Sequence, residues 1–234
     1  MEPVLRVRKI SGEVVCALDA RELGDLVQTQ GDSLLALKRY CCKRLDASIY
    51  RQRFVCLGES VNDKSKLSEF IFPLELQVVI LPFKIPNSNL AESLVQAAAR
   101  GRGVEEFLEI PIHPDVLDGW AESALFVAAS EGFADVVSQL LEAGACPDQE
   151  ISMGRTPLWS ASCCHGVARL RDSIRTVRLL LEAGADKDIA DVIGLTPLFN
   201  AAMEGQLEVV RLLVKAGAQI DAWLKVSSLR FISL

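Results

Sequence analysis

The sequence predicts an α+β protein in two parts, an N-terminal domain of strands and one helix followed by an all-α repeat solenoid. Short segments that alternate apolar and polar residues occur in residues 1–86, whereas a helical pattern recurs about every 33 residues over 87–234. The length of 234 residues fits one or two domains, and 50% hydrophobic residues suffice to bury a core. We therefore expect two domains, 1–86 and 87–234.

Composition and charge exclude several classes of protein. The longest uncharged apolar stretch, 78–83, is far shorter than the roughly 18 residues of a membrane span, and the N-terminus shows no secretory signal. We expect an intracellular protein, cytoplasmic or nuclear, that does not bind membranes and whose seven cysteines are mostly buried thiols. The net charge is +2 over residues 1–86 and −8 over 87–234, so the acidic part is expected to repel nucleic acid.

The first domain is predicted from strand alternation and one helical stripe. Val4–Arg8 alternates apolar and basic residues, and a Ser11-Gly12 turn leads into a second strand. Apolar residues at helical spacing, with Asp32 or Ser33 as a cap, predict one amphipathic helix. The predicted elements are strands over 4–8 and 13–18, a helix over 33–45, and strands over 53–58 and 74–81.

The predicted helix carries the one local cluster of basic residues in the sequence, formed by Lys38, Arg39, Lys43 and Arg44. We interpret these residues as the solvated face of the helix rather than as a phosphate-binding patch. The first domain is therefore not predicted to bind nucleic acid either.

The order of these strands and the helix, together with the segment 52–70, resembles ubiquitin over most of residues 1–86. The resemblance implies a β-grasp fold. The connection over 19–31 is longer than in that family. Because the chain continues after the last strand without a terminal Gly-Gly, the resemblance does not imply a conjugated tag.

The same resemblance implies an exposed apolar patch that docks on partner proteins. This patch falls on Ile10, Val55 and Val79, all of which are apolar. If Phe54 faces the helix, strand alternation points Val55 away from it. The alternative, that these are ordinary strand residues with partial burial, stays open.

A repeating unit organises the second domain. The triplets at 123–125, 156–158 and 196–198 lie 33 and 40 residues apart, and seven extra residues around 166–173 account for the longer interval. A small-residue helix, an apolar helix and an Ala-Gly-Ala follow each triplet, and a degenerate earlier copy starts at Leu94. The predicted repeats lie near 90–118, 119–151, 152–191 and 192–222.

Each residue type in the unit has a structural role. Thr156 and Thr196 can cap the first helix, where a following proline loses no hydrogen bond. Gly132 and Gly205 can end that helix in the left-handed conformation. This set resembles the ankyrin repeat over about residues 88–222.

The match departs from the family at one position. The residue after each leucine is usually histidine, but here it is Phe126, Trp159 or Phe199. We expect apolar packing to replace the hydrogen bonds that histidine would make to the neighbouring loop.

The ankyrin resemblance implies a stiff stack that binds a partner protein on its concave side, formed by the first helices and the loop tips. Trp120 and the methionines rank highest as anchors because large apolar side chains dominate hot spots. For Val192 and Ile193, packing against the next loop tip is an equal alternative. Because residues 87–234 carry a net negative charge, we expect a partner surface that is basic or mixed in charge. The expected contact residues are Trp120, Glu122, Glu131, Met153, Arg155, Cys164, Val192, Ile193, Leu195, Met203 and Glu204.

No catalytic motif is found, and we expect no enzyme activity, no cofactor and no metal site. The chain has two histidines, His113 and His165, and lacks a P-loop, G-x-S-x-G and C-x-x-C. Cys163, Cys164 and His165 are consecutive, and consecutive helical residues point about 100° apart, which disfavours a shared metal.

The sequence thus predicts a non-catalytic adaptor, in which the ankyrin stack binds one partner protein and the ubiquitin-like domain docks through its apolar patch. The alternative is a regulatory or substrate-recruiting subunit of an enzyme assembly, such as a ubiquitin-pathway complex. We expect a monomer unless the apolar C-terminal segment 223–234 pairs. Either that segment folds back as a cap on the stack, or the chain is a truncated piece of a longer array.

Overall fold

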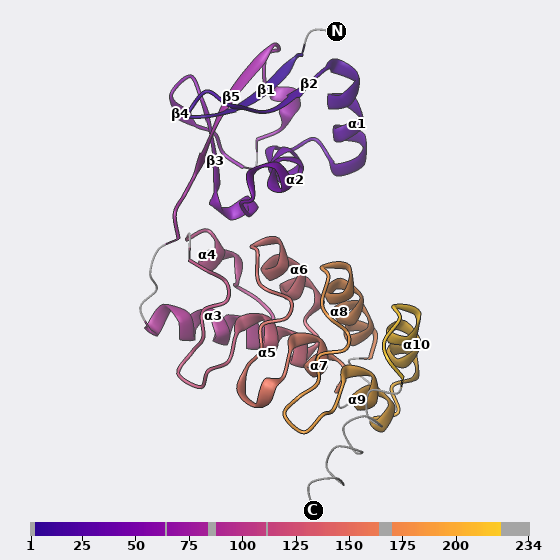
Figure 1. Ribbon diagram of the computed structural model, residues 1–234. Helices are drawn as coiled ribbons and strands as arrows, with labels where there is room; N and C mark the ends of the chain where they lie inside the picture. Colours follow the sequence, from indigo (N-terminus) through magenta and orange to yellow (C-terminus); the bar gives the residue numbers. More distant parts are fainter. Residues whose placement is uncertain (1–2, 64, 84–87, 111, 164–169, 221–234) are drawn as a thin grey trace, which may run out of the picture. The chain divides into compact units, whose positions relative to one another are not determined.

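The computed structural model describes residues 3–63, 65–83, 88–110, 112–163 and 170–220 (Figure 1). It divides the chain into two compact units, Met1–Lys84 and Ile85–Leu234, which we call unit 1 and unit 2. In the described residues, unit 1 contains all five strands, and unit 2 is helical with short bridges in its loops.

Unit 1 has one mixed sheet with strand order β2-β1-β5-β3-β4. Strands β1 and β5 run parallel, and the other neighbours are antiparallel. The elements are β1 Leu5–Lys9, β2 Val14–Leu18, α1 Ala20–Gln30, α2 Leu34–Leu45, η1 Ile49–Arg51, β3 Gln52–Cys56, β4 Glu59–Ser60, η2 Leu67–Glu69 and β5 Leu74–Ile80.

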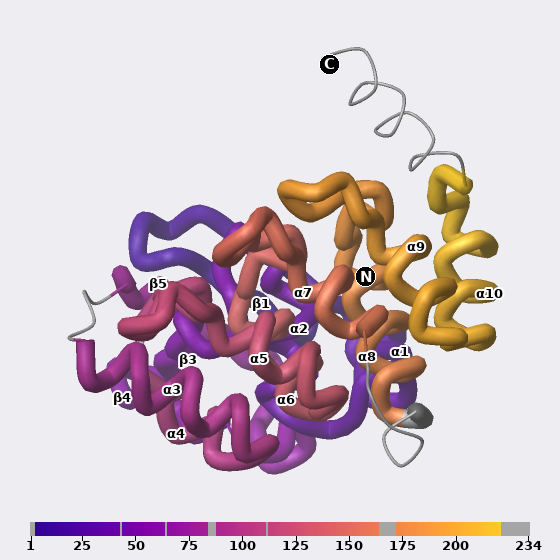
Figure 2. Tube along the Cα trace, turned by 90° about the horizontal axis from the view of Figure 1, so that it is seen from below, coloured from indigo at the N-terminus to yellow at the C-terminus, as the bar shows by residue number. Residues whose placement is uncertain are grey.

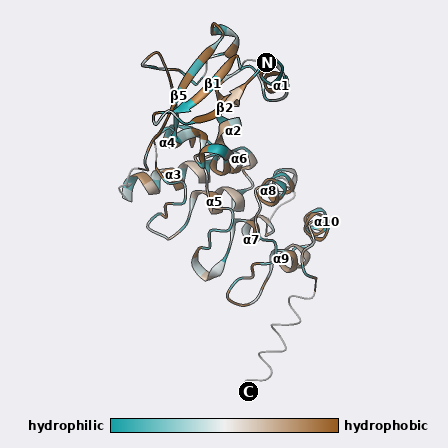
Figure 3. Cartoon of the chain, turned by 45° about the horizontal axis from the view of Figure 1, so that its top comes forward, coloured by the Kyte–Doolittle hydropathy of each residue, from teal (hydrophilic) through white to brown (hydrophobic). Residues whose placement is uncertain are grey.

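The core of unit 1 lies between the sheet and α2. Leu37 and Cys41 from α2 pack in one buried cluster with Val7, Phe54 and Leu76 from the strands. Alternation decides which strand residues enter this core, and apolar and polar residues accordingly alternate along the strands in Figure 3. This five-stranded sheet with its helix is consistent with a ubiquitin-like β-grasp.

Helix α1 fills the connection over 19–31, where the sequence analysis predicts no element. A capping box starts this helix: Asp19 Oδ1 accepts hydrogen bonds from the backbone N–H groups of Arg21 and Glu22, both at 2.9 Å. Glu22 in turn accepts from the Asp19 N–H at 3.0 Å. Leu26 is buried, so α1 packs on the core rather than forming an exposed loop.

The prediction of a solvated basic face on α2 is wrong for Lys38. This side chain is fully buried, and its Nζ lies 2.5 Å from Asp63 Oδ2. The reason is positional, because Lys38 lies four residues after Leu34 and therefore falls on the apolar stripe of the helix. Loss of hydration lowers the pKa of Lys38, while the hydrogen bond to Asp63 raises it less strongly.

Unit 2 stacks four helix pairs in its described residues. The first helices form one row, with α5 between α3 and α7, and the second helices form another, with α8 between α6 and α10 (Figures 1 and 2). The helices are α3 Ser88–Arg100, α4 Glu105–Leu108, α5 Ala124–Glu131, α6 Ala134–Glu142, α7 Pro157–Ala161, α8 Leu170–Glu182, α9 Pro197–Met203 and α10 Leu207–Lys215.

The predicted helix caps are confirmed. Thr156 and Thr196 accept hydrogen bonds from the N–H groups three residues ahead, both at 3.2 Å, and Ser123 does the same for α5. Gly132 ends α5 in the left-handed region at φ 72°, where a glycine carries no Cβ penalty. No helix in the described residues is long and apolar enough to cross a membrane.

A ladder of aspartates links each repeat to the next. Asp115 accepts from the Cys146 N–H at 2.9 Å, and Asp148 accepts from the Asp186 N–H at 2.8 Å. Asp188 accepts from the backbone N–H at position 219 at 2.7 Å. Burial raises the pKa of Asp115 more than this hydrogen bond lowers it. Each carboxylate thus fixes the loop of the following repeat.

Candidate protein-binding surfaces

The loop before α5 holds Trp120 in an exposed position. Asp118 Oδ1 accepts hydrogen bonds from the N–H groups of Trp120 at 2.8 Å and Glu122 at 3.0 Å. An antiparallel backbone bridge between Leu117 and Ser123 joins the two ends of this loop. The indole side chain is 84% exposed, so a well-held backbone presents a large apolar group to solvent.

The next two loop tips are tied to each other. The Val192 N–H donates to the Met153 carbonyl oxygen at 2.9 Å. Asp191 Oδ1 holds the second of these tips by accepting from the Ile193 and Leu195 N–H groups at 3.0 and 2.9 Å. The loops are therefore ordered by their own hydrogen bonds rather than by a partner.

Four exposed apolar side chains lie at the tips of these three loops, and we call them the loop-tip ridge: Trp120, Met153, Val192 and Ile193. Their side chains remain open to solvent, with 52% exposure for Met153, 62% for Val192 and 45% for Ile193. The backbone of Val192 contacts the neighbouring tip, yet most of its side chain is not buried by that contact. The ridge is an apolar surface that nothing in the described residues covers.

Two other predicted contact residues, Arg155 and Leu195, meet at Trp159 beside the ridge. The Arg155 guanidinium lies 4.4 Å from the centre of the Trp159 ring, and the indole N–H of Trp159 donates to the Leu195 carbonyl at 3.1 Å. The expectation that apolar packing alone replaces the family's histidine is thus wrong for Trp159. Tryptophan carries a ring N–H of its own, which reaches the loop of the next repeat.

The remaining predicted contact residues of unit 2 differ in exposure. Met203 is 59% exposed near the end of α9. Glu122, Glu131 and Glu204 are half-buried and supply negative charge near the loop and helix ends. Cys164 lies outside the described residues.

A family model described as ankyrin repeats matches residues 94–191 and 165–223. The chain belongs to the ankyrin-repeat family. A search of curated proteins gave no match. The family assignment agrees with the two rows of helices and with the ordered loops that carry the ridge.

Two of the three predicted patch residues, Val55 and Val79, lie on the outer face of the unit 1 sheet. Val55 faces Gln77 and Val79 faces Arg53 across β3 and β5, opposite to the core side of Phe54 and Val78. The paired part of β1 ends one residue before Ile10, next to the same end of β5. Ile10 is 71% exposed, whereas Val55 and Val79 are half-buried.

Two large apolar side chains of unit 1 escaped the sequence analysis as candidate contacts. Leu57 is 100% exposed in the turn after β3, and Ile71 is 89% exposed before β5. Leu57 lies beyond the end of β3 with a left-handed backbone at φ 51°, so strand alternation does not give the direction of its side chain. No local pattern marks Ile71.

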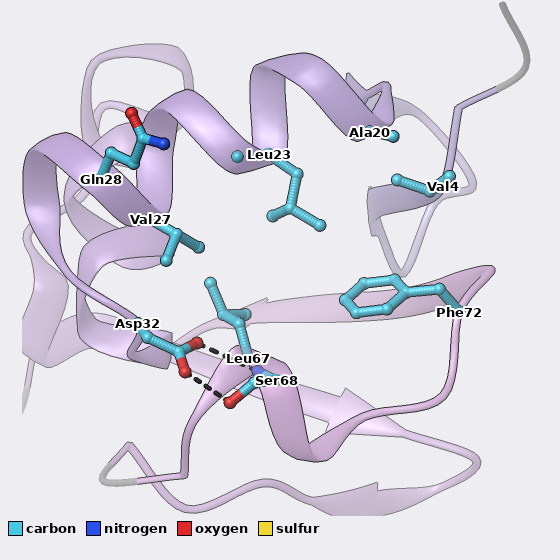
Figure 4. A pocket seen from close by; sticks show the side chains of 10 residues that line it. Val4, Ala20, Leu23, Val27, Gln28, Asp32, Leu67, Ser68 and Phe72 are labelled. Carbon is cyan, nitrogen blue, oxygen red and sulfur yellow. Dashed lines mark hydrogen bonds between the residues drawn. The ribbon is translucent and has the colours of Figure 1, made fainter.

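Unit 1 also contains a groove of about 500 Å³ that the sequence analysis does not predict (Figure 4). Leu23 and Val27 point into it from α1, and Leu67 and Phe72 point into it from the opposite side. A capping-box pattern before α1 was the signal that could have indicated this helix, and the groove with it.

The groove has one charged residue among those that line it, Asp32. Ser68 donates to this carboxylate through its hydroxyl group and, at 3.0 Å, through its backbone N–H. These hydrogen bonds lower the pKa of Asp32, because they stabilise the ionised form. Among the described residues, no group of three His, Cys, Asp or Glu side chains could hold a metal ion.

Proposed function

We propose that this ankyrin-repeat protein is a non-catalytic adaptor. The ankyrin repeats bind one partner protein along the loop-tip ridge and the adjoining ends of the first helices. Unit 1 docks on a second protein through Ile10, Val55 and Val79. The ankyrin family generally binds proteins and is generally non-catalytic, which supports the coarser part of this proposal.

The observation that carries the proposal is the contrast between exposure and order at the loop tips. An apolar patch that is exposed on the isolated protein marks a site where a partner protein covers it in the complex. Here Trp120 and Met153 sit on loops that are already fixed by hydrogen bonds. A fixed loop loses little conformational entropy on binding, so less of the favourable free energy of the apolar contact is offset.

The partner surface is expected to be apolar at its centre and basic at its rim. Trp120 and Met153 require apolar contacts, while Glu122, Glu131 and Glu204 favour positive charge around them. Arg155 adds one positive charge stacked on Trp159, so a single acidic group on the partner fits beside the ridge.

Affinity capture with the full chain, followed by quantitative mass spectrometry, tests the ridge. Trp120→Ala and Met153→Ala should each weaken the captured partner by at least about 1 kcal/mol. Leu207→Ala is the matched control, because Leu207 is 68% exposed on α10 and outside the ridge. Equal capture by all three variants would contradict a binding role for the ridge.

A parallel experiment tests the patch on unit 1. Val55→Arg should abolish capture of a second partner with little shift in the melting temperature of unit 1, since Val55 is half-buried on the outer face of the sheet and points away from the core. Ile71→Arg is the control at an exposed apolar residue away from the patch. A large loss of stability in Val55→Arg would instead assign Val55 to structural packing.

A further inference from the structure

Two cysteine sulfurs touch inside the core of unit 1. Cys16 lies on β2 and Cys41 on α2, and their Sγ atoms are 3.7 Å apart. Both side chains are buried, at 5% and 0% exposure. A disulfide needs an Sγ–Sγ distance of about 2.05 Å. The two sulfurs therefore need to approach by less than about 2 Å to form that bond.

The position of β2 gives an oxidant a route to this pair. Strand β2 lies at the edge of the sheet and pairs only with β1 among the described strands. The register between them shifts at Val7 and Arg8, which weakens the ladder beside Cys16. Edge strands open locally at a lower free energy than the whole domain unfolds, and such an opening exposes Cys16 first.

The pKa values of the two thiols are shifted in opposite directions. The hydrogen bond from the Cys41 thiol lowers the pKa of Cys16, with a smaller contribution from the positive charge of Arg44. The same hydrogen bond, together with burial, raises the pKa of Cys41. Cys16 also lies on the edge strand, so it is the thiol that an oxidant reaches first, and the thiolate is the nucleophile in peroxide chemistry.

We propose that Cys16 and Cys41 form a site of reversible oxidation by hydroperoxides, which closes a disulfide between β2 and α2. The Cys16 thiolate attacks one oxygen of hydrogen peroxide, the O–O bond breaks, and Cys16 becomes a sulfenic acid as hydroxide leaves and is protonated to water. Cys41 then attacks the Cys16 sulfur, the S–S bond forms and the S–O bond breaks with release of a second water. Two thiols are oxidised by two electrons, and one peroxide is reduced to two waters.

The neighbouring cysteine is placed differently. Cys42 follows Cys41 on α2, but its sulfur accepts a hydrogen bond from Gln52 Nε2 at 3.2 Å and is only partly buried. In the part of the chain that the structure describes, Cys16 and Cys41 are the sulfurs within hydrogen-bond distance of each other. The assignment to Cys41 rather than Cys42 is therefore specific enough to test.

Peptide mapping of the full chain tests this site. The protein is treated with hydrogen peroxide, alkylated and cut with trypsin, which should release Ile10–Arg21 disulfide-linked to Tyr40–Lys43, with a mass two hydrogens below the sum of the first peptide and the second peptide alkylated once, at Cys42. In Cys42→Ser the second peptide retains one cysteine, so the link must persist. This substitution leaves the sulfurs of Cys16 and Cys41 in place.

Two further measurements make the test decisive. Cys41→Ala should lose the linked pair, and dithiothreitol should remove it from the wild type. The oxidised wild type should also melt at a higher temperature than the reduced protein, since the bond joins residues 25 positions apart. The proposal is overturned if peroxide oxidises exposed Cys146 while no linked pair forms, or if Cys42→Ser abolishes the link.

Discussion

Lys38 illustrates how a single residue can escape sequence analysis. A lysine near three other basic residues predicts a solvated face. Its helical position instead places it in the core, where Asp63 supplies the opposite charge. Gln52 is buried beside it and donates to the Lys38 and Ala47 carbonyls at 3.3 and 2.9 Å. Because Asp63 is 25 residues away, no local pattern reveals this pairing.

Removal of Asp63 should destabilise unit 1. Asp63→Ala leaves the Lys38 ammonium group buried without its partner, and we expect the free energy of unfolding of unit 1 to fall by about 3 kcal/mol. The double variant Lys38→Met, Asp63→Ala removes the buried charge as well and should recover most of this loss. Urea titration followed by the amide NMR signals of unit 1 measures both effects.

A surface ion pair provides the matched control for this substitution. Lys9 and Glu13 lie four residues apart, with Lys9 Nζ 2.8 Å from Glu13 Oε2, and their side chains are 35% and 64% exposed. Glu13→Ala should therefore change the free energy of unfolding by less than about 1 kcal/mol. If Asp63→Ala behaved like Glu13→Ala, the pairing of buried Lys38 with the partly exposed Asp63 would have no special role in stability.

The same lysine should make the stability of unit 1 rise at alkaline pH. Burial lowers the pKa of Lys38 in the folded state below the roughly 10.4 of an unfolded lysine. Between these two values the unfolded chain binds more protons than the folded chain, so the free energy of unfolding increases with pH. Urea titrations across this range should show a steeper rise for the wild type than for Lys38→Met. Parallel curves would rule out this contribution.

Among the elements, those defined by local patterns are the ones that could be predicted. Thr-Pro starts, glycine ends and the recurring spacing predicted the helices of unit 2, because caps and periodicity depend on neighbouring residues. Strand alternation likewise placed Val55 on the outer face. Helix α1 was missed although local signals for it were present, since Leu23, Leu26 and Val27 lie at helical spacing after the Asp19 capping box.

Contacts between distant segments account for most of what the sequence did not reveal. The hydrogen bond from Val192 to Met153 and the one from Trp159 to Leu195 join different repeats. Each depends on how one repeat stacks on the next, which periodicity alone does not specify. The sequence thus indicated the exposed ridge residues without the bonds that order their loops.

The aspartate ladder should contribute measurably to the stability of unit 2. Asp148→Ala removes the acceptor for the Asp186 N–H, and we expect a loss of about 1–2 kcal/mol in the free energy of unfolding. Asp148→Asn keeps a carbonyl acceptor at the same place and should lose less. Tryptophan fluorescence during urea unfolding reports unit 2 alone, because every tryptophan follows residue 119. Equal midpoints for Asp148→Ala and the wild type would contradict a stabilising role.

Charge is the property of the whole molecule that most restricts its partners. The net charge of −6 is concentrated in residues 87–234. In unit 1 six of the basic side chains are engaged within the fold. The engaged side chains are Arg8 with Glu75, Lys9 with Glu13, Lys38 with Asp63, Arg44 over Tyr40, Arg51 over Phe83 and Arg53 with the Tyr50 carbonyl.

The full chain should accordingly fail to bind duplex DNA. Non-specific binding requires several cations that reach neighbouring phosphates, and each contact releases a counterion. Folding breaks up the basic run on α2, because Lys38 is buried and Arg44 stacks 4.5 Å from the centre of the Tyr40 ring. Fluorescence anisotropy of a labelled duplex at low salt should therefore give a dissociation constant weaker than about 0.1 mM. Tighter binding that weakened with salt and disappeared in Arg39→Glu would show that α2 presents a phosphate-binding face after all.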